Sequence, residues 1–218
     1  MIRFENTVTP SPEQWAAIIR GVRNPKNSWK QSDSYKTRME SANTDLDTDF
    51  EYFIGEKDLD LMMRLRQAGT DHRKYMRMIP VYVDITSNHT WWAEFDTYKV
   101  GTVRNSCSKM HKVHVKEFAA DDFSHEGIDQ IPWMMEEFER TISNLEKLRV
   151  LYNETLEKKY WRAIIEYLPL GFNLKATIML NYEVLANIYN ARKGHKMDEW
   201  HDFREWIESL PYAELITA

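Results

Sequence analysis

The sequence predicts an α+β fold: a mostly helical single domain over residues 1–218, with a small antiparallel or mixed sheet. Aromatic residues make up 13% of the chain whereas glycine numbers only seven, a mix that favours a well-packed, helix-rich protein. Residues 78–86, "MIPVYVDIT", are rich in β-branched and aromatic side chains, as strands are. Helical periodicity dominates the chain after residue 131, and no internal repeat or linker divides it.

The N-terminal quarter predicts a strand, a helix and a long irregular segment. Residues 2–9 alternate enough to form a short strand. Ser11 is then a good N-cap, with Pro12 at the first helical position and Glu13 in the first turn. Residues 24–50 are polar and weakly periodic, so we expect a loop or an arm that reaches over a neighbour.

The middle and C-terminal parts predict the strand at 78–86 and several helices. The first helix, 56–69, ends at Gly69, because glycine readily adopts the left-handed conformation that follows a helix. Its apolar positions are Leu59, Met62, Met63 and Leu65. Further helices are expected from residue 131 to Pro169, over most of 173–192, and over 197–210.

Composition excludes several classes of function. The net charge of −5 provides no basic surface for duplex nucleic acid. A single cysteine excludes an intramolecular disulfide framework and a thiolate zinc finger. No apolar run approaches the roughly 20 residues that span a bilayer, and the start, "MIRFENTVTP", lacks the order of a signal peptide. We therefore expect a cytoplasmic protein without a membrane partner.

Stock catalytic motifs are absent from the sequence. It has no Gly-rich phosphate loop, no G-x-S-x-G elbow and no H-E-x-x-H motif. His111 and His114 lie three residues apart, but no carboxylate or third histidine stands at ligand spacing, so no metal site is expected. The functional question therefore rests on two unusual segments, residues 91–113 and 168–192.

The first unusual segment is "WWAEFDTYKVGTVRNSCSKMHKV". It begins with two tryptophans, continues with acids, aromatics and bases, and ends in a run of small polar residues. Such a stretch offers stacking rings, carboxylates and hydroxyl and amide donors within few positions. The polar run consists of Asn105, Ser106, Cys107 and Ser108.

The second unusual segment is "LPLGFNLKATIMLNYEVLANIYNAR". Asn181 and Asn187 interrupt an otherwise apolar helix, and a buried asparagine is costly unless both ends of its amide find partners. Arg192 closes the segment. Taken alone, Arg192 is a cation at a helix C-terminus, where it stabilises the helix dipole and where Gly194 ends the helix.

Read together, the two segments resemble the flavin-dependent thymidylate synthases. That family's C-terminal block consists of Leu-Pro, two spaced asparagines and an arginine, followed by a helix that contains histidine. The resemblance covers roughly residues 57–208. The corresponding residues here are Leu168, Pro169, Asn181, Asn187 and Arg192, and His195 and Glu199 lie close to the following histidine and glutamate.

The family's signature is R-H-R-x-x-S-x-N-x-x-S-x-R, and the first segment is similar to its second half. Asn105 and Ser108 stand at the Asn-x-x-Ser spacing. Where the family has R-H-R, this chain has either residues 97–99 or, without a gap, residues 98–100. In both alignments only Lys99 keeps a positive charge.

Two further arginines of the family pattern are missing. Met110 stands at the final arginine of the signature, between Lys109 and His111. Ile165 stands where the family has a phosphate-binding arginine, and Arg162 lies one turn earlier. Lysine can supply charge at such positions but not the planar bidentate fork of arginine.

The resemblance implies a homotetramer in which FAD accepts hydride from NADPH, and methylenetetrahydrofolate supplies carbon to C5 of dUMP. Arg192 would be catalytic: it would pair with the uracil edge and stabilise negative charge as C5 becomes nucleophilic. The implied substrate-binding residues are Glu94, Ser106, Ser108, Arg162 and Arg192. The implied cofactor-binding residues are Tyr98, Lys99, Asn105, Asn181, Asn187 and His195. Trp91, Trp92 and Tyr98 would stack on planar rings.

Three functions are compatible with this pattern. The first is flavin-dependent methylation of a uracil nucleotide. The second keeps the fold and a pyrimidine nucleotide but changes the chemistry or the base. The third is a non-catalytic nucleotide-binding or structural relative. The missing arginines favour the second and third, whereas the retained Asn–Asn–Arg block favours the first and second.

Overall fold

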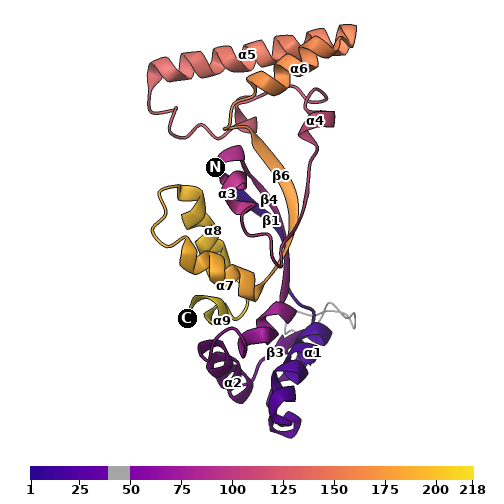
Figure 1. Ribbon diagram of the computed structural model, residues 1–218, viewed down its shortest axis with the longest axis vertical. Helices are drawn as coiled ribbons and strands as arrows, with labels where there is room; N and C mark the ends of the chain where they lie inside the picture. The colour runs from indigo at the N-terminus through magenta and orange to yellow at the C-terminus, as the bar shows by residue number, and fades with distance from the viewer. Residues whose placement is uncertain (39–49) are drawn as a thin grey trace. The chain divides into compact units, whose positions relative to one another are not determined.

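The computed structural model describes residues 1–38 and 50–218 (Figure 1). The described chain divides into two compact units. Unit 1 comprises Met1–Glu5, Asp84–Thr97 and Arg104–Ile178. Unit 2 comprises Asn6–Val83, Tyr98–Val103 and Met179–Ala218. The expectation of a single domain over residues 1–218 stays a prediction.

The fold is α+β and mostly helical, as predicted. The strands are β1 (Ile2–Val8), β2 (Tyr35–Arg38), β3 (Phe50–Phe53), β4 (Pro80–Asn88), β5 (Val103–Ser106) and β6 (Asn173–Asn181). The longer helices are α1 (Pro12–Arg23), α2 (Glu56–Gln67), α3 (His89–Phe95), α5 (Pro132–Thr155), α6 (Lys158–Tyr167), α7 (Tyr182–Ala191) and α8 (Asp198–Glu208). The short ones are η1 (Asn24–Lys26), η2 (Trp29–Gln31), η4 (Arg73–Met78), α4 (Lys109–Lys112), η5 (Ala120–Asp122) and α9 (Glu214–Thr217).

The strands form two small sheets. One has four strands in the order β1-β4-β6-β5, and the other pairs β2 with β3. The second pair is antiparallel, with Tyr35 opposite Phe53. Among the described residues, no helix is both long and apolar enough to cross a membrane.

The N-terminal strand and helix lie where the sequence predicts them. The Ser11 hydroxyl accepts from the Gln14 backbone N–H at 3.3 Å, and the Gln14 side chain accepts from the Ser11 backbone N–H at 2.8 Å. This capping box satisfies two donors that a helix start would otherwise leave without partners. The helix α1 then buries Trp15, Ile18 and Val22 in the core of unit 2.

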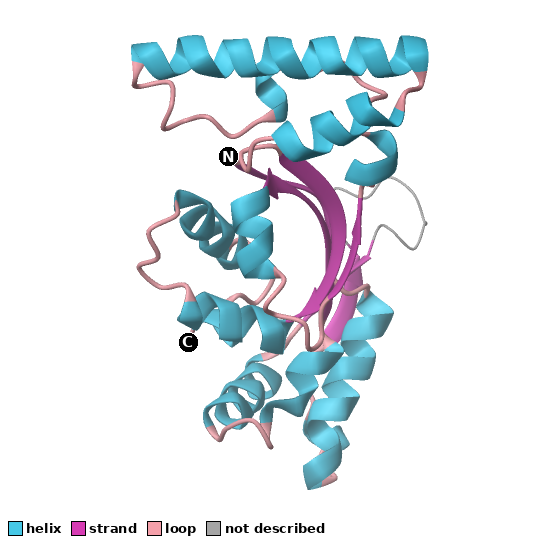
Figure 2. Ribbon diagram, turned by 45° about the horizontal axis from the view of Figure 1, so that its top comes forward, coloured by secondary structure: helices cyan, strands magenta, loops and turns pink. Residues whose placement is uncertain are grey.

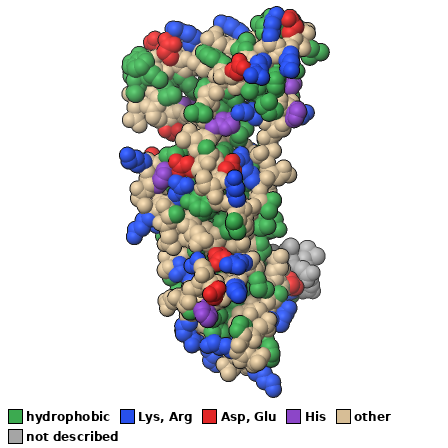
Figure 3. Space-filling model, viewed as in Figure 1, with side chains coloured by type: hydrophobic (Ala, Val, Ile, Leu, Met, Phe, Trp, Pro, Cys, Tyr) green, Lys and Arg blue, Asp and Glu red, His purple; other side chains and the backbone are tan. Residues whose placement is uncertain are grey.

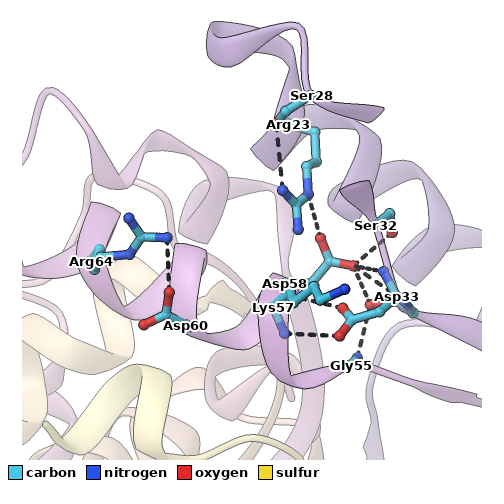
Figure 4. A network of polar contacts seen from close by, with 10 residues as sticks. Arg23, Ser28, Ser32, Asp33, Gly55, Lys57, Asp58, Asp60 and Arg64 are labelled. Carbon is cyan, nitrogen blue, oxygen red and sulfur yellow. Dashed lines mark hydrogen bonds and ion pairs between the residues drawn. The ribbon is translucent and has the colours of Figure 1, made fainter. Parts of the chain in front are cut away.

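The prediction of a loop or arm over residues 24–50 is wrong for the described part of that segment. Residues 24–38 contain η1, η2 and the strand β2, while residues 39–49 lie outside the described part of the chain. The polar composition gave no sign of these elements, because side-chain hydrogen bonds rather than an apolar face hold the segment in place. Four of these bonds have Asp58 of α2 as their acceptor (Figure 4).

Asp58 is fully buried and is surrounded by donors. One carboxylate oxygen accepts from Arg23 Nε at 2.6 Å, and the other accepts from the hydroxyls of Ser32 at 2.6 Å and Ser34 at 2.7 Å. Burial alone would raise the pKa of this carboxyl. The serine and arginine hydrogen bonds outweigh burial and hold the pKa of Asp58 below its usual range.

The strand predicted at 78–86 is confirmed as β4, although it begins two residues later. Its burial alternates, with Val81 and Val83 fully buried and Tyr82 between them exposed. This period of two is expected for a strand that covers a core with one face. The displaced start reflects the preceding 3-10 helix η4, which ends at Met78.

The single helix expected from residue 131 to Pro169 is instead two helices, α5 and α6. Leu156, in the left-handed region at φ 56°, ends α5, and its N–H donates to the Tyr152 carbonyl at 2.7 Å. The apolar periodicity continues on both sides of this turn, so the pattern contains no sign of the break. The two helices lie side by side in Figures 1 and 2. Phe138, Leu145 and Ile164 join them to one apolar cluster.

The helix expected over most of 173–192 is wrong in its first half, which is the strand β6. Ala176, Ile178 and Leu180 are buried in alternation, which is the pattern of a strand. Asn181 ends the strand and caps α7, because its side-chain oxygen accepts from the Val184 N–H at 3.1 Å. The helix expected over 197–210 is confirmed as α8.

Candidate functional site

Arg192 lies at the C-cap of α7, within unit 2, among aromatic side chains. Its Nε–H donates to the Tyr98 hydroxyl at 2.8 Å. Its guanidinium carbon lies 4.3 Å from the centre of the Trp200 ring and 5.4 Å from that of Tyr98. A cation over an aromatic face is attracted by the ring quadrupole, more strongly when it is partly desolvated. Arg192 is half-buried, so the rings hold the guanidinium in a defined position.

Trp200 of α8 contacts both Arg192 and Tyr98. It is fully buried, and its ring meets that of Tyr98 edge-on with the centroids 6.2 Å apart. The ring of His195 approaches the same indole at 6.1 Å. His195 Nδ1 accepts from the Met197 N–H at 3.2 Å, which fixes the orientation of the imidazole. Three of the predicted site residues, Tyr98, Arg192 and His195, therefore meet around one tryptophan.

The turn that carries Tyr98 and Lys99 packs against the start of α7. Gly101 has φ +79°, a conformation that L side chains rarely adopt. A Cβ at Gly101 would lie 3.0 Å from both the Asn181 Nδ2 atom and a methyl group of Val184. The predicted residues Tyr98, Lys99 and Asn181 therefore come from neighbouring parts of unit 2, with the Lys99 side chain exposed.

Asn187 is exposed on α7 rather than buried, contrary to the expectation of two buried asparagines. Its amide oxygen accepts from Arg73 Nη2 at 3.2 Å. Arg73 also donates from Nε to the buried Glu183 at 3.3 Å, and Arg77 pairs with the same carboxylate. Burial alone would raise the pKa of Glu183, but the two guanidinium groups outweigh it and lower the pKa. The Asn187 amide is thus held by its oxygen, so its NH₂ group is the end presented for other contacts.

The remaining predicted residues lie in unit 1. Asn105 and Ser106 are exposed at the end of β5. The Ser108 hydroxyl accepts from the His111 N–H at 3.2 Å and caps α4. Glu94 is half-buried in α3. Asn105, Ser106 and Ser108 therefore lie together at the end of β5 and the start of α4, whereas Glu94 belongs to a separate element, α3.

Trp91 and Trp92 do not stack on a ligand, so that expectation is wrong. They are 0% and 2% exposed, and Trp91 stacks on Phe95 with centroids 4.9 Å apart. The Trp92 indole N–H donates to the Leu174 carbonyl at 3.0 Å, and Arg104 lies 3.9 Å over its ring. The two tryptophans build the core of unit 1 instead.

Arg162, the arginine nearest to the missing phosphate-binding position, lies at the surface of unit 1. Its side chain is 66% exposed and pairs with Glu166, one turn later on α6. An exposed pair of this kind is a surface contact of small energy. Ile165, at the position of the family's arginine, is half-buried against the apolar cluster between α5 and α6.

Unit 1 also contains a cavity of about 360 Å³. Its walls come from β1, β4, β6, the residues after β5, the short helix α4 and the segment from α4 through η5. Positive and negative side chains are interspersed over the face drawn in Figure 3, whereas the lining of this cavity has five cations and two carboxylates. The charged and polar lining residues are Arg3, Thr86, Cys107, Ser108, Lys109, Lys112, Lys116, Asp121, Asp122, Asn173 and Lys175.

Several residues of these sites escaped the sequence analysis. Trp200 lies in a predicted helix, and nothing in its local pattern separates a core tryptophan from one that supports an arginine. Arg73 also escaped the sequence analysis, because its partners Glu183 and Asn187 are more than a hundred residues away in the sequence. Only the run of bases at Lys109 and Lys112, directly after Ser108, was a local signal of an anion site.

The chain has the fold of the flavin-dependent thymidylate synthases. It is similar to the crystal structure of flavin-dependent thymidylate synthase ThyX from Helicobacter pylori complexed with FAD and dUMP, with TM-score 0.65 and 15% identity. That match covers 99% of this chain and 97% of the other. A second structure of the Helicobacter pylori enzyme with FAD and dUMP matches with the same TM-score and identity, over 99% and 95%. No family model matches the sequence, and no curated protein matches it.

Proposed function

We propose that this chain, with the fold of the flavin-dependent thymidylate synthases, transfers a one-carbon unit to C5 of dUMP in a flavin-dependent reaction. The observation that carries the proposal is the position of Arg192. The arginine that ends the Leu-Pro…Asn…Asn…Arg block is held by Tyr98 and Trp200, in a fold shared with an enzyme solved with FAD and dUMP. A cation used only to cap a helix would need neither partner.

Arg192 is the residue that we assign to catalysis. A guanidinium carries five N–H donors in a rigid plane, and the Tyr98 hydroxyl takes the one on Nε. Two parallel N–H donors of such a plane match the edge of a uracil ring. Negative charge develops on the pyrimidine as C5 becomes nucleophilic, and a positioned cation stabilises that charge without rearranging. The rings of Tyr98 and Trp200 keep water from one side of the group, which strengthens the interaction.

The residues of unit 2 fit a flavin cofactor in part. Asn187 presents its NH₂ group, because Arg73 holds the amide oxygen, and a flavin offers carbonyl and ring-nitrogen acceptors. Asn181 uses its oxygen to cap α7, so only its Nδ2 atom, beside Gly101, can serve a ligand. Asn187, Asn181 and Tyr98 would hold FAD. When bound, FAD would supply the hydride transfer that this chain's own side chains cannot perform.

The remaining components follow from the same proposal. NADPH would be the reductant and methylenetetrahydrofolate the carbon donor. No thiolate nucleophile is assigned, in keeping with the single cysteine of the chain. We further propose a cytoplasmic homotetramer. Light scattering tests the oligomeric state directly, and a monomer at micromolar concentration contradicts the tetramer.

One observation favours a second candidate, in which the fold binds a pyrimidine nucleotide but the chemistry differs. The arginines of the signature are replaced, and Arg162, the nearest substitute for the phosphate-binding arginine, pairs with Glu166 at the surface. Different binding contacts to the nucleotide or the flavin would accompany a different reaction. The same loss is expected of a non-catalytic nucleotide-binding relative.

The test is turnover by the purified protein supplied with FAD, NADPH, methylenetetrahydrofolate and dUMP. Formation of dTMP, with the visible absorption band of oxidised flavin in the purified or reconstituted protein, is the expected result. Flavin binding and dUMP binding without dTMP point to the second candidate. A folded protein that binds neither flavin nor dUMP contradicts the proposed function.

A further inference from the structure

Residues 24–38 of unit 2 are basic, although the whole chain carries a net charge of −5. Four bases stand against one acid in this segment, a net charge of +3; they are Lys26, Lys30, Lys36 and Arg38 against Asp33. Lys and Arg side chains gather at the lower tip of the face drawn in Figure 3, over α1, which this segment follows. A local excess of positive charge on an acidic protein attracts an anionic partner to one place on the surface.

Trp29 holds its ring at this surface in a fixed orientation. The residue is 49% exposed, and its indole N–H donates to the Asn24 Oδ1 atom at 2.8 Å. The turn of η2 fixes the backbone, because the Ser32 N–H donates to the Trp29 carbonyl at 3.2 Å. A large apolar ring that is oriented and left at the surface offers a face on which a planar group can stack.

Lys26 and Lys30 flank Trp29 and have no carboxylate partner in the described chain. Both side chains are exposed. Lys36 differs from them, because its Nζ lies 2.8 Å or less from a carboxylate: it pairs with Glu13 at 2.7 Å. Cations beside an aromatic ring are the arrangement that binds single-stranded nucleic acid, in which the ring stacks on a base and the cations follow the phosphates.

A pocket of about 380 Å³ opens next to the same segment. Pro25 of η1, which precedes Lys26, forms part of its wall. Gly21 allows Met78 to pack against α1, because a Cβ at Gly21 would lie 3.1 Å from the Met78 sulfur. The volume falls within the range of small-molecule sites, so a nucleobase fits it. The apolar lining residues are Val22, Pro25, Leu65, Tyr75 and Met78.

The polar side chains of the pocket suit a nucleotide as well. Lys74 is exposed and has no carboxylate partner in the part of the chain that the structure describes, so it provides a third cation for phosphate. The Asp71 carboxylate accepts hydrogen bonds, and the His72 imidazole can donate one and accept one. The edges of nucleobases carry donors and acceptors that match these groups.

A membrane surface and a duplex fit this region less well. A helix that lies on a membrane turns its apolar face toward the lipid. The helix α1 instead buries its apolar residues, including Trp15 and Ile18, in the core of unit 2. In a duplex the bases are stacked on one another, so their faces are closed to the Trp29 ring. A single strand exposes both its bases and its phosphates.

We propose that this surface of unit 2 binds single-stranded nucleic acid. One base stacks on Trp29, another enters the pocket, and Lys26, Lys30 and Lys74 contact phosphates. DNA and RNA share the bases and phosphates that these groups recognise. The region contains none of the residues that we assign to FAD or to the uracil ring, so this binding is separate from the proposed function.

Fluorescence anisotropy with labelled oligo(dT) and oligo(U) of roughly 12 nucleotides tests the proposal. Trp29→Ala should raise the Kd at least about fivefold, because it removes a stacking face, whereas Trp29→Phe should retain most of the affinity. Lys26→Ala/Lys30→Ala should reduce the slope of log K against log salt concentration by about 1.4, because each phosphate contact to a single strand contributes about 0.7. Comparison of the two oligonucleotides shows whether DNA or RNA is preferred, and binding of either supports the proposal.

Matched controls come from unit 1. Trp133→Ala removes a tryptophan that is 65% exposed, and Lys147→Ala/Lys158→Ala removes two exposed lysines. Both controls should bind the oligonucleotides as the wild type does. Far-UV circular dichroism and melting temperature establish that every variant folds. The assay requires neither FAD nor turnover, so its result does not depend on the proposed function.

Several results would overturn the proposal. One is the absence of oligonucleotide binding by the folded wild type at low salt, and another is equal affinity of wild type and Trp29→Ala. Displacement of the oligonucleotide by dUMP would place the binding at the candidate uracil site. Equally tight binding of duplex DNA, or equal competition by polyglutamate, would reduce the interaction to charge alone. Binding to vesicles of anionic lipid that Trp29→Ala loses, without oligonucleotide binding, would assign the surface to a membrane.

Discussion

The Nε–H of Arg192 donates a hydrogen bond to the Tyr98 hydroxyl at 2.8 Å, joining the end of α7 to the turn before β5. The same guanidinium lies over the Trp200 ring. The arginine is thus fixed by a phenol and an indole whose rings meet edge-on. A cation fixed in this way is oriented before any ligand arrives, which is the condition for electrostatic catalysis.

Tyr98→Phe should separate the hydrogen bond from the aromatic contact, because it removes the hydroxyl and keeps the ring. A hydrogen bond to a charged group contributes about 1.5–3 kcal/mol when buried. Tyr98 is only half-buried, so we expect a loss near the lower end, or roughly 3–6 °C in Tm for a chain of this size. Scanning calorimetry measures it. Tyr167→Phe, at an exposed position on α6, is the control and should leave Tm unchanged.

Arg73→Met should weaken FAD binding without removing any predicted cofactor contact. The guanidinium of Arg73 holds the Asn187 amide oxygen, and loss of that hydrogen bond, worth about 0.5–1.5 kcal/mol, lets the amide rotate. We expect the Kd for FAD to rise roughly two- to tenfold in a flavin-fluorescence titration.

Arg77→Met is the matched control for Arg73→Met. It removes the other cation that pairs with Glu183 but has no hydrogen bond to Asn187 in the described chain. It should lower stability and leave FAD affinity at the wild-type value. Equal losses of FAD affinity in both variants would mean that Glu183, and not the orientation of Asn187, is what matters.

Asp58→Asn should be strongly destabilising at neutral pH. It leaves the Arg23 guanidinium buried without a counter-charge, a change that costs about 3–5 kcal/mol. Urea unfolding at pH 7 measures this difference. Asp60→Asn, which breaks the exposed pair with Arg64 on the same helix, should cost less than about 1 kcal/mol (Figure 4).

The effect of Asp58 should also depend on pH in a defined direction. Because folding lowers the pKa of this carboxyl, its contribution is fully present above the unfolded-state pKa of about 3.9. It is lost as the pH falls through the lower folded-state pKa. The difference in unfolding free energy between wild type and Asp58→Asn should therefore narrow in acid. A difference that stays constant from pH 7 down to pH values where the wild type begins to unfold would contradict the assignment.

The sequence predicts elements well where the signal is local. Ser11 and Pro12 identify the start of α1, and the β-branched run at β4 identifies a strand, because each depends on neighbouring residues only. Prediction from the sequence fails where one apolar pattern is compatible with both a strand and a helix. The apolar residues of β6 were assigned to a helix, although Asn181 is a good N-cap and could have marked the boundary.

The candidate site is predictable in its residues but not in its contacts. Arg192 and Tyr98 are both recognisable from the two unusual segments, yet their hydrogen bond joins positions 94 residues apart. Lys109 and Lys112 follow Ser108 within four residues of the sequence, whereas Arg3 reaches the same cavity from the first strand. Such groupings depend on how the strands pair, which residue patterns alone do not specify.

Binding of dUMP to Arg192→Lys tests the central claim most directly. Lysine keeps the positive charge but cannot form two parallel hydrogen bonds with a uracil edge. Calorimetry should show dUMP affinity at least about tenfold weaker than in the wild type, or roughly 1.4 kcal/mol. Lys193→Ala, the neighbouring exposed cation, should bind dUMP as the wild type does. If all three proteins bind dUMP with equal affinity, Arg192 is only a helix cap and the assignment of the uracil site is wrong.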